Sequence, residues 1–218
     1  MALASDQAHC LPYPFRTQPP MRLHRTLGRT LLFCLVALCC RTPDYLPLKE
    51  NLVWRYAAVR CEVRPPHEIT SESLTYALAV TGSAVQPGLG RVYEVHLTRG
   101  EEPYLSFFFR QTRNAVFVLP AAHLDGLEPT AGWLKLLELP LREGAFWYGD
   151  AERSVSMEVA ARDSVQVPAG RFRECFRVRL HAPDPYRMDI WLAPDAGIVR
   201  WQRTLSSVRS EHAVRIGR

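Results

Sequence analysis

The chain has 218 residues and a formal net charge of +5, with 47% hydrophobic and 22% charged residues. This composition is ordinary for a chain that folds around an apolar core, so it excludes a disordered or collagen-like protein. The 17 prolines and the 10% of aromatic residues argue against a helix bundle and favour short strands joined by turns.

The first forty residues are expected to be an export signal outside the folded domain. Residues 21–40 begin with the cationic side chains of Arg22, Arg25 and Arg29 and continue into an uncharged apolar run. As a helix, this run would reach about 16 Å, about half of the bilayer core, so a permanent transmembrane helix is not expected. We interpret residues 1–20 as a non-native upstream extension, with Met21 as the start. An unusually long charged head is the alternative.

The end of the apolar run is similar to a bacterial lipoprotein signal, in which a cysteine follows a short apolar and small-residue box. Cys40 fits this pattern better than Cys39, because the residue before Cys39 is the large Leu38. Both cysteines are candidates for lipidation, and simple secretion is the alternative. No aspartate follows either cysteine, which by resemblance to lipoprotein sorting favours the outer membrane. The expected location is the periplasm or cell envelope, with membrane contact through an N-terminal lipid.

Removing residues 1–40 changes the charge and cysteine counts of the remaining domain. Those residues hold four of the 27 basic and one of the 22 acidic side chains, so residues 41–218 carry a net charge of about +2. The basic pI therefore gives no argument for nucleic-acid binding. Only Cys61 and Cys175 remain. Two thiols in an exported chain predict one disulfide between them, with two independent thiols as the alternative.

Residues 41–218 are predicted to form a single antiparallel β domain of nine or ten strands. Extended segments are expected at residues 52–61, 74–81, 92–97, 104–110, 115–119, 155–159, 172–180, 188–192 and 198–205. Their spacing is typical of an antiparallel sandwich or barrel, so the fold class is mainly β with at most one or two short helices. Residues 132–139 are short and uniformly apolar, and we expect a flap or a short helix over the sheet there.

Three segments together resemble a known family. They are YLPLKEN at residues 45–51, running into VWRY at 53–56; VPAGRF at 167–172; and WLAPDAGIVR at 191–200. In this order they resemble a broad set of functionally uncharacterised bacterial secreted proteins and lipoproteins with a LolA-like domain. The resemblance covers most of residues 45–205. It implies a single antiparallel sheet curved into a half-open barrel, an envelope location and the handling of apolar molecules, and it supplies no catalytic residues.

These motifs also have structural explanations as turns. Pro168 sets φ and Gly170 accepts a left-handed conformation, which predicts a turn between two strands. Asp195 is interpreted in the same way, as a turn residue before Gly197 and not as a catalytic acid. Many of the resembling proteins have glycine where this chain has Asn51, and asparagine can also adopt a positive φ, so the same turn is expected.

The sequence contains no recognisable catalytic motif. It has no Gly-x-Ser-x-Gly elbow, no Walker glycine loop and no His-Glu-x-x-His metal helix, and its histidines lack ligand spacing. We therefore predict no catalytic residue, metal or cofactor. A hydrolase whose site is assembled only in the fold stays an alternative.

The preferred hypothesis is a non-enzymatic, exported domain that binds a lipid or another apolar ligand on a concave sheet face. Its rival is an envelope interaction or assembly protein whose sheet is filled by its own side chains. Neither protein partners nor the oligomeric state can be named. The candidate residues for lining a ligand site are Phe107, Phe109, Trp133, Leu136 and Leu137.

Overall fold

A computed structural model describes residues 43–64, 68–120, 132–183 and 185–217. The expectations for residues 1–20, residues 21–40, Cys39 and Cys40 lie outside these ranges. The described residues form twelve strands and no helix, so none of their segments is a helix able to cross a membrane. The strands are β1 (Val53–Arg64), β2 (Glu68–Gln86), β3 (Gly90–Arg99), β4 (Glu102–Gln111), β5 (Ala115–Pro120), β6 (Leu134–Glu138), β7 (Phe146–Tyr148), β8 (Ser156–Val167), β9 (Gly170–His181), β10 (Arg187–Ala193), β11 (Gly197–Ser206) and β12 (Arg209–Gly217).

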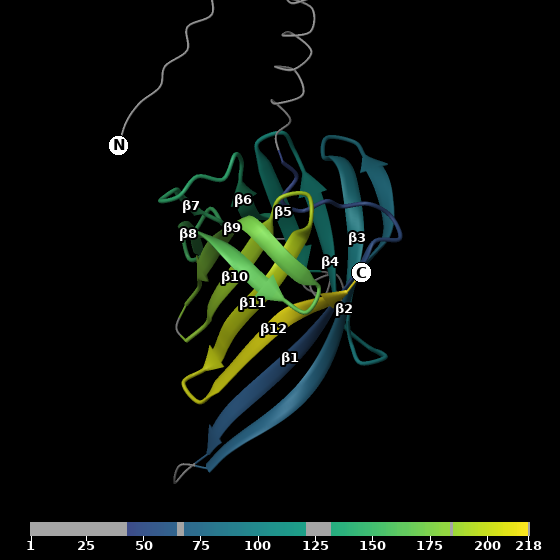
Figure 1. The fold of residues 1–218 in the computed structure, drawn as a ribbon. Coiled ribbons are helices and arrows are strands. Elements are labelled where there is room, and N and C mark those ends of the chain that lie inside the picture. Colours follow the sequence, from purple (N-terminus) through teal and green to yellow (C-terminus); the bar gives the residue numbers. More distant parts are fainter. Residues whose placement is uncertain (1–42, 65–67, 121–131, 184, 218) are drawn as a thin grey trace, which may run out of the picture. The chain divides into compact units, whose positions relative to one another are not determined.

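All twelve strands belong to one antiparallel sheet (Figure 1). Strands β1–β6 and strands β7–β12 form two meanders, which join where β1 pairs with β12. At the opposite side, the backbone N–H of Lys135 in edge strand β6 donates to the carbonyl of Gly149, just after β7, at 2.8 Å. The indole N–H of Trp147 donates to the Lys135 carbonyl at 3.2 Å. The sheet is therefore nearly closed into a barrel, which confirms the fold class expected from the sequence.

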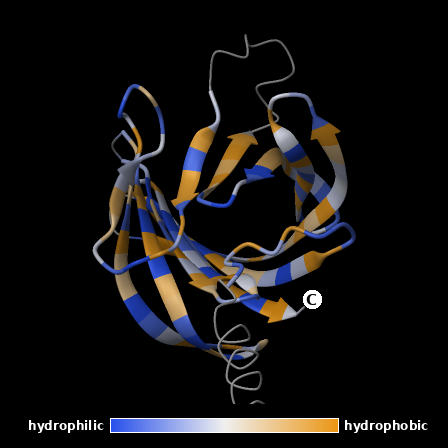
Figure 2. Cartoon of the chain, turned by 90° about the horizontal axis from the view of Figure 1, so that it is seen from above, coloured by the Kyte–Doolittle hydropathy of each residue, from blue (hydrophilic) through white to orange (hydrophobic). Residues whose placement is uncertain are grey.

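Alternate side chains of the strands point into the barrel and form its core. Along β1, Trp54, Tyr56 and Ala58 are buried, whereas Arg55 between them and Val59 after them are exposed. Figure 2 shows the resulting bands of hydrophobic and hydrophilic residues along the strands. The inward side chains of both meanders pack into one continuous apolar core, because closing the sheet brings the two apolar faces together.

The segment before β1 packs into this core and is tied to the turn between β10 and β11. Tyr45, Leu46 and Leu48 are buried in the core. The backbone N–H of Asp44 donates to Asp195 Oδ1 at 3.1 Å, and the Asp44 carbonyl accepts from the Asp195 N–H at 2.7 Å. These reciprocal bonds fix the chain entering the barrel.

The predicted turns are confirmed by the backbone conformation. Gly170 has a φ of 133° between β8 and β9, and Asp195 and Gly197 have φ values of 57° and 83° between β10 and β11. Asn51 has a φ of 64° just before β1. Asp195 is therefore a turn residue, and its carboxylate accepts a backbone hydrogen bond.

The three sequence motifs meet around one carbonyl in the β10–β11 turn. The Trp54 indole N–H donates to the Ala196 carbonyl at 3.1 Å, and Arg215 Nη1 donates to the same oxygen at 2.7 Å. The Arg215 carbonyl in turn accepts from the Ala169 N–H of the β8–β9 turn at 3.2 Å. A Cβ on Gly197 would lie 3.2 Å from the Trp54 ring, so glycine is needed there. The motifs are thus linked structural elements of one corner.

The tip of the β8–β9 hairpin forms a second, smaller core on the outside of the barrel. Two register shifts within the hairpin bend it, as bulges do. Beyond the bends, its side chains pack against residues of β10 and β11 that point away from the barrel interior. This second cluster contains Val165, Val167, Cys175, Trp191, Ala193, Ala196 and Val199.

The predicted disulfide between Cys61 and Cys175 is wrong, because both thiols are free. Cys61 lies on β1 and Cys175 on β9, with β12, β11 and β10 between them. Four strand spacings separate the two by roughly 19 Å along the sheet, whereas a disulfide needs Cα atoms within about 7 Å. Burial in the second cluster raises the pKa of the Cys175 thiol.

The prediction for residues 132–139 and the predicted strand count are also wrong. Strand β6 occupies this segment, where Leu137 pairs with Val116 of β5, so there is neither a flap nor a short helix. The sequence reading missed β6, β7 and β12. Strand β7 has only three residues, and β12 turns the charged side chains of Glu211 and Arg215 inward, which breaks the expected alternation of apolar and polar residues.

Candidate functional site

The barrel interior contains an apolar cavity of about 300 Å³. Both meanders contribute its walls, so it exists only because the sheet closes on itself. Most of the lining is hydrocarbon or aromatic. Aliphatic lining residues include Leu78, Leu105 and Val118 from the first meander and Leu180, Ile190 and Ile198 from the second.

Three of the five side chains predicted to line a ligand site do line this cavity. They are Phe107 and Phe109 on β4 and Leu136 on β6. The rings of the two phenylalanines lie 6.2 Å apart between centroids. Leu137 is fully buried in the core and does not reach the cavity. The alternation along β4, which the sequence shows, puts these two phenylalanines on one face of the strand, and that face lines the cavity.

Trp133, the remaining candidate, does not line the cavity. It precedes β6, and the side chains of β6 that line the cavity are those of Leu134 and Leu136. The Trp133 ring instead lies 5.6 Å from the guanidinium carbon of Arg110. That arginine also stacks on Phe117 at 4.4 Å. Trp133 therefore takes part in a cation–π group.

The cavity also has polar wall residues that the sequence did not single out. The hydroxyl of Tyr56 donates to the Ile198 carbonyl at 3.0 Å, and burial raises the pKa of this tyrosine strongly. Trp201 packs on the Tyr76 ring, with 5.7 Å between centroids. Arg203 stacks over Trp201 at 5.2 Å. Of the described residues that line the cavity, Arg203 alone is charged.

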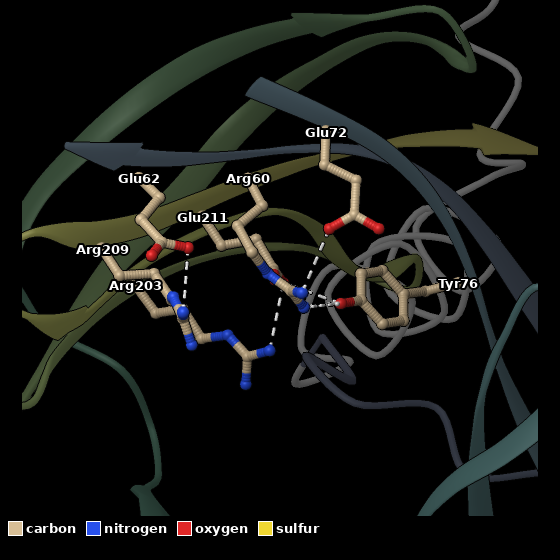
Figure 3. Close-up of polar contacts among 7 residues, drawn as sticks. All are labelled: Arg60, Glu62, Glu72, Tyr76, Arg203, Arg209 and Glu211. Carbon is tan, nitrogen blue, oxygen red and sulfur yellow. Dashed lines mark hydrogen bonds and ion pairs between the residues drawn. The ribbon is translucent and has the colours of Figure 1, made fainter. Parts of the chain in front are cut away.

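Arg203 belongs to a line of four charged side chains across adjacent strands, here called the charge row (Figure 3). Its members are Glu72 on β2, Arg60 on β1, Glu211 on β12 and Arg203 on β11, and each is the register partner of the next. Glu211 Oε2 accepts from Arg60 Nε at 3.1 Å and Nη2 at 3.0 Å, and from the Tyr76 hydroxyl at 3.1 Å. Glu211 Oε1 accepts from Arg203 Nη2 at 3.1 Å.

The buried part of the charge row carries a net positive charge. The Glu211 side chain is 0% exposed, whereas Arg60 and Arg203 are 16% and 13% exposed. Glu72 is 59% exposed, so solvent screens its 3.3 Å ion pair with Arg60. Two largely buried guanidinium groups therefore share one fully buried carboxylate.

The protonation of Arg203 is secured by its surroundings. Burial lowers its pKa, but the charge of Glu211 and the neighbouring Tyr104 and Tyr186 raise it by more, so the net shift is upward. Burial also raises the pKa of Tyr186, which keeps that hydroxyl protonated. The Nε of Arg203 is buried and has no hydrogen-bond partner among the described residues.

The geometry thus defines a nearly closed antiparallel β-barrel with an apolar interior cavity and one cationic wall residue. No family model matches the chain, and no curated protein matches it either. Solved structures that are similar to it include three bacterial proteins. A candidate lipoprotein from Parabacteroides distasonis has a TM-score of 0.44 at 13% identity, and covers 81% of this chain and 99% of its own.

The second similar structure is a candidate exported protein with a YmcC-like fold from Bacteroides fragilis, with a TM-score of 0.43, 14% identity, and 80% and 98% coverage of the two chains. The third is a LolA superfamily protein from Nitrosomonas europaea, with a TM-score of 0.22, 10% identity, and 78% and 85% coverage. The fold assignment itself rests on the strand order and register of this chain.

Proposed function

We propose that the protein is an exported, lipid-anchored envelope protein of non-enzymatic type, whose barrel interior binds a lipid or another apolar ligand. The observation that carries this proposal is the apolar cavity of about 300 Å³ inside the barrel. Its volume lies at the lower end of the range of roughly 300–1,000 Å³ that is usual for small-molecule sites. Apolar cavities do not hold water well and accept apolar guests.

The energetic cost of such a cavity supports a ligand. Side chains around an unfilled apolar space lose packing contacts, which lowers stability. An apolar ligand would restore such contacts, and it would also remove its own apolar surface from water.

The ligand is tested by extracting purified protein and identifying co-purified lipids by mass spectrometry. Leu105→Trp places a larger side chain in the cavity, and should abolish lipid co-purification while raising the melting temperature. Val85→Trp is the matched control, because Val85 is 71% exposed on β2 and should leave both unchanged. If no lipid co-purifies with the unmodified protein and added lipid does not raise its melting temperature, the interior serves only as a core and the assembly-protein alternative is favoured.

Export and anchoring are supported by the cationic start and apolar run of residues 21–40. Lipidation is tested by incorporation of labelled palmitate in a bacterial host. Cys40→Ser should abolish the label if Cys40 carries the lipid, and Cys39→Ser should do so if the neighbouring cysteine is used. Protein that is secreted without label would contradict anchoring and leave simple secretion.

A further inference from the structure

We propose that the ligand is a single-chain amphiphile with an anionic head group, and that Arg203 binds this head group. The inference rests on the proposed function, because it assigns the chemistry of the ligand that the cavity holds. It starts from the fact that an otherwise apolar cavity has one charged wall residue. With a purely apolar guest, the partners of that charge would be Glu211 and the hydroxyls of Tyr104 and Tyr186, with no second anion.

The charge balance next to the cavity favours an anion. Arg60 and Arg203 share the single buried carboxylate of Glu211, so this part of the charge row has a positive excess. Arg60 alone gives two hydrogen bonds to Glu211, at 3.1 and 3.0 Å, and Tyr76 gives a third. The carboxylate is therefore well satisfied without Arg203. Buried charges are costly unless they are paired, and an anionic ligand would complete the pairing.

Arg203 has free hydrogen-bonding capacity for such a ligand. A guanidinium has five N–H donors, and the bond to Glu211 uses Nη2. The Nε–H is buried without a hydrogen-bond partner among the described residues. Tyr186, which also lines the cavity, interacts with Arg203 through its hydroxyl oxygen and donates its proton to the weakly accepting Met188 sulfur at 3.6 Å. Its hydroxyl could turn to a carboxylate or phosphate oxygen with a gain in hydrogen-bond strength.

The size of the cavity indicates one alkyl chain per ligand. Its volume of about 300 Å³ is small among ligand sites, which argues against a lipid with several acyl chains. The aliphatic and aromatic walls contact the chain, and Arg203 meets the head. A carboxylate and a phosphate share the required chemistry, since both present anionic oxygens to a guanidinium.

The experiment compares probes that share one ten-carbon chain and differ in the head group. Binding of decanoate, decyl phosphate, decan-1-ol and decylamine to the full chain is measured by calorimetry at neutral pH. Both anions, or one of them, should bind roughly 10- to 100-fold more tightly than decan-1-ol, the ratio expected for a charge-assisted hydrogen bond. Decylamine should bind most weakly. Preference for decanoate over decyl phosphate would assign a fatty-acid-like ligand, and the reverse a phosphate head.

Variants separate the head-group inference from the cavity itself. Arg203→Gln should remove the preference for the anions and keep the affinity for decan-1-ol, while Arg203→Lys should retain part of the preference. Arg209→Gln is the control, because Arg209 pairs with Glu62 in Figure 3, is 46% exposed and does not line the cavity. Equal binding of the anions and the alcohol, or a preference that survives Arg203→Gln, would overturn the inference alone. Failure of all four probes to bind would overturn the proposed function with it.

Discussion

The charge row gives a quantitative prediction for Glu211→Gln. This substitution preserves the size of the side chain and removes the only buried negative charge between Arg60 and Arg203. Three of the four hydrogen bonds to the carboxylate come from these two arginines. Removing one partner of a buried ion pair typically costs about 3–5 kcal/mol. The glutamine oxygen still accepts from one guanidinium, so we expect a loss near the lower end, about 3 kcal/mol.

The assay is urea unfolding at neutral pH, followed by tryptophan fluorescence, for the unmodified protein and each variant. Glu62→Gln is the matched control, because Glu62 lies on β1, next to β12, and pairs at 2.9 Å with the half-exposed Arg209. Solvent screens this pair, so its loss should cost much less stability than the loss of the buried carboxylate. Adding Arg203→Gln to Glu211→Gln should restore part of the lost stability, because it removes one unpaired charge. Equal losses for Glu211→Gln and Glu62→Gln would refute the reasoning.

Three further predictions concern the turn, the core and the thiols. Gly197→Ala should lower the free energy of unfolding by about 1–3 kcal/mol in urea titrations, because φ is 83° and the new Cβ would press on Trp54. Burial raises the pKa of Tyr56, so this tyrosine stays protonated in the folded state above pH 10, where it ionises in the unfolded chain. The free energy of unfolding should therefore be unaffected by Tyr56 below about pH 10 and fall by about 1.4 kcal/mol per pH unit above it. Tyr56→Phe should reduce this slope in unfolding titrations at increasing pH. In alkylation followed by peptide mass spectrometry without reductant, Cys175 should react only after denaturation, and recovery of a Cys61–Cys175 disulfide would contradict the structure.

The fold could be predicted from the sequence where alternation and turn chemistry agreed. Strand β4 alternates around Phe107 and Phe109, and the face that this alternation defines is the one that lines the cavity. The turn at Gly170 was predicted from its Pro-Ala-Gly segment, and the positive φ of Asn51 from the resemblance together with the ability of asparagine to adopt it. These signals are local, because neighbouring residues along one strand determine them. They can therefore be recognised in the sequence without knowledge of the tertiary structure.

The candidate site could not be predicted in full, because it depends on register and on pairing between distant strands. Leu134 and Leu136 line the cavity and Trp133 does not, and the uniformly apolar run of residues 132–139 shows no alternation from which this could be predicted. The charge row unites residues 60, 72, 203 and 211, which no sequence spacing connects. In β12, the buried Glu211 made the strand itself unrecognisable, because hydrophobic periodicity assumes that inward residues are apolar.

Stability alone does not account for the charge row. Well-packed apolar residues in place of a buried ion pair are often neutral or stabilising, so a barrel selected only for stability would gain nothing from Arg60, Glu211 and Arg203. One role of the charge row is to fix the register of β1 and β12, which join the two meanders. A one-residue slip of β12 would turn Glu211 to the outside and leave both arginines inside the barrel without their carboxylate partner. Register explains the pair of Arg60 with Glu211, which already satisfies the carboxylate. It does not explain why a second arginine lines the cavity with a donor unused, and an anionic head group does.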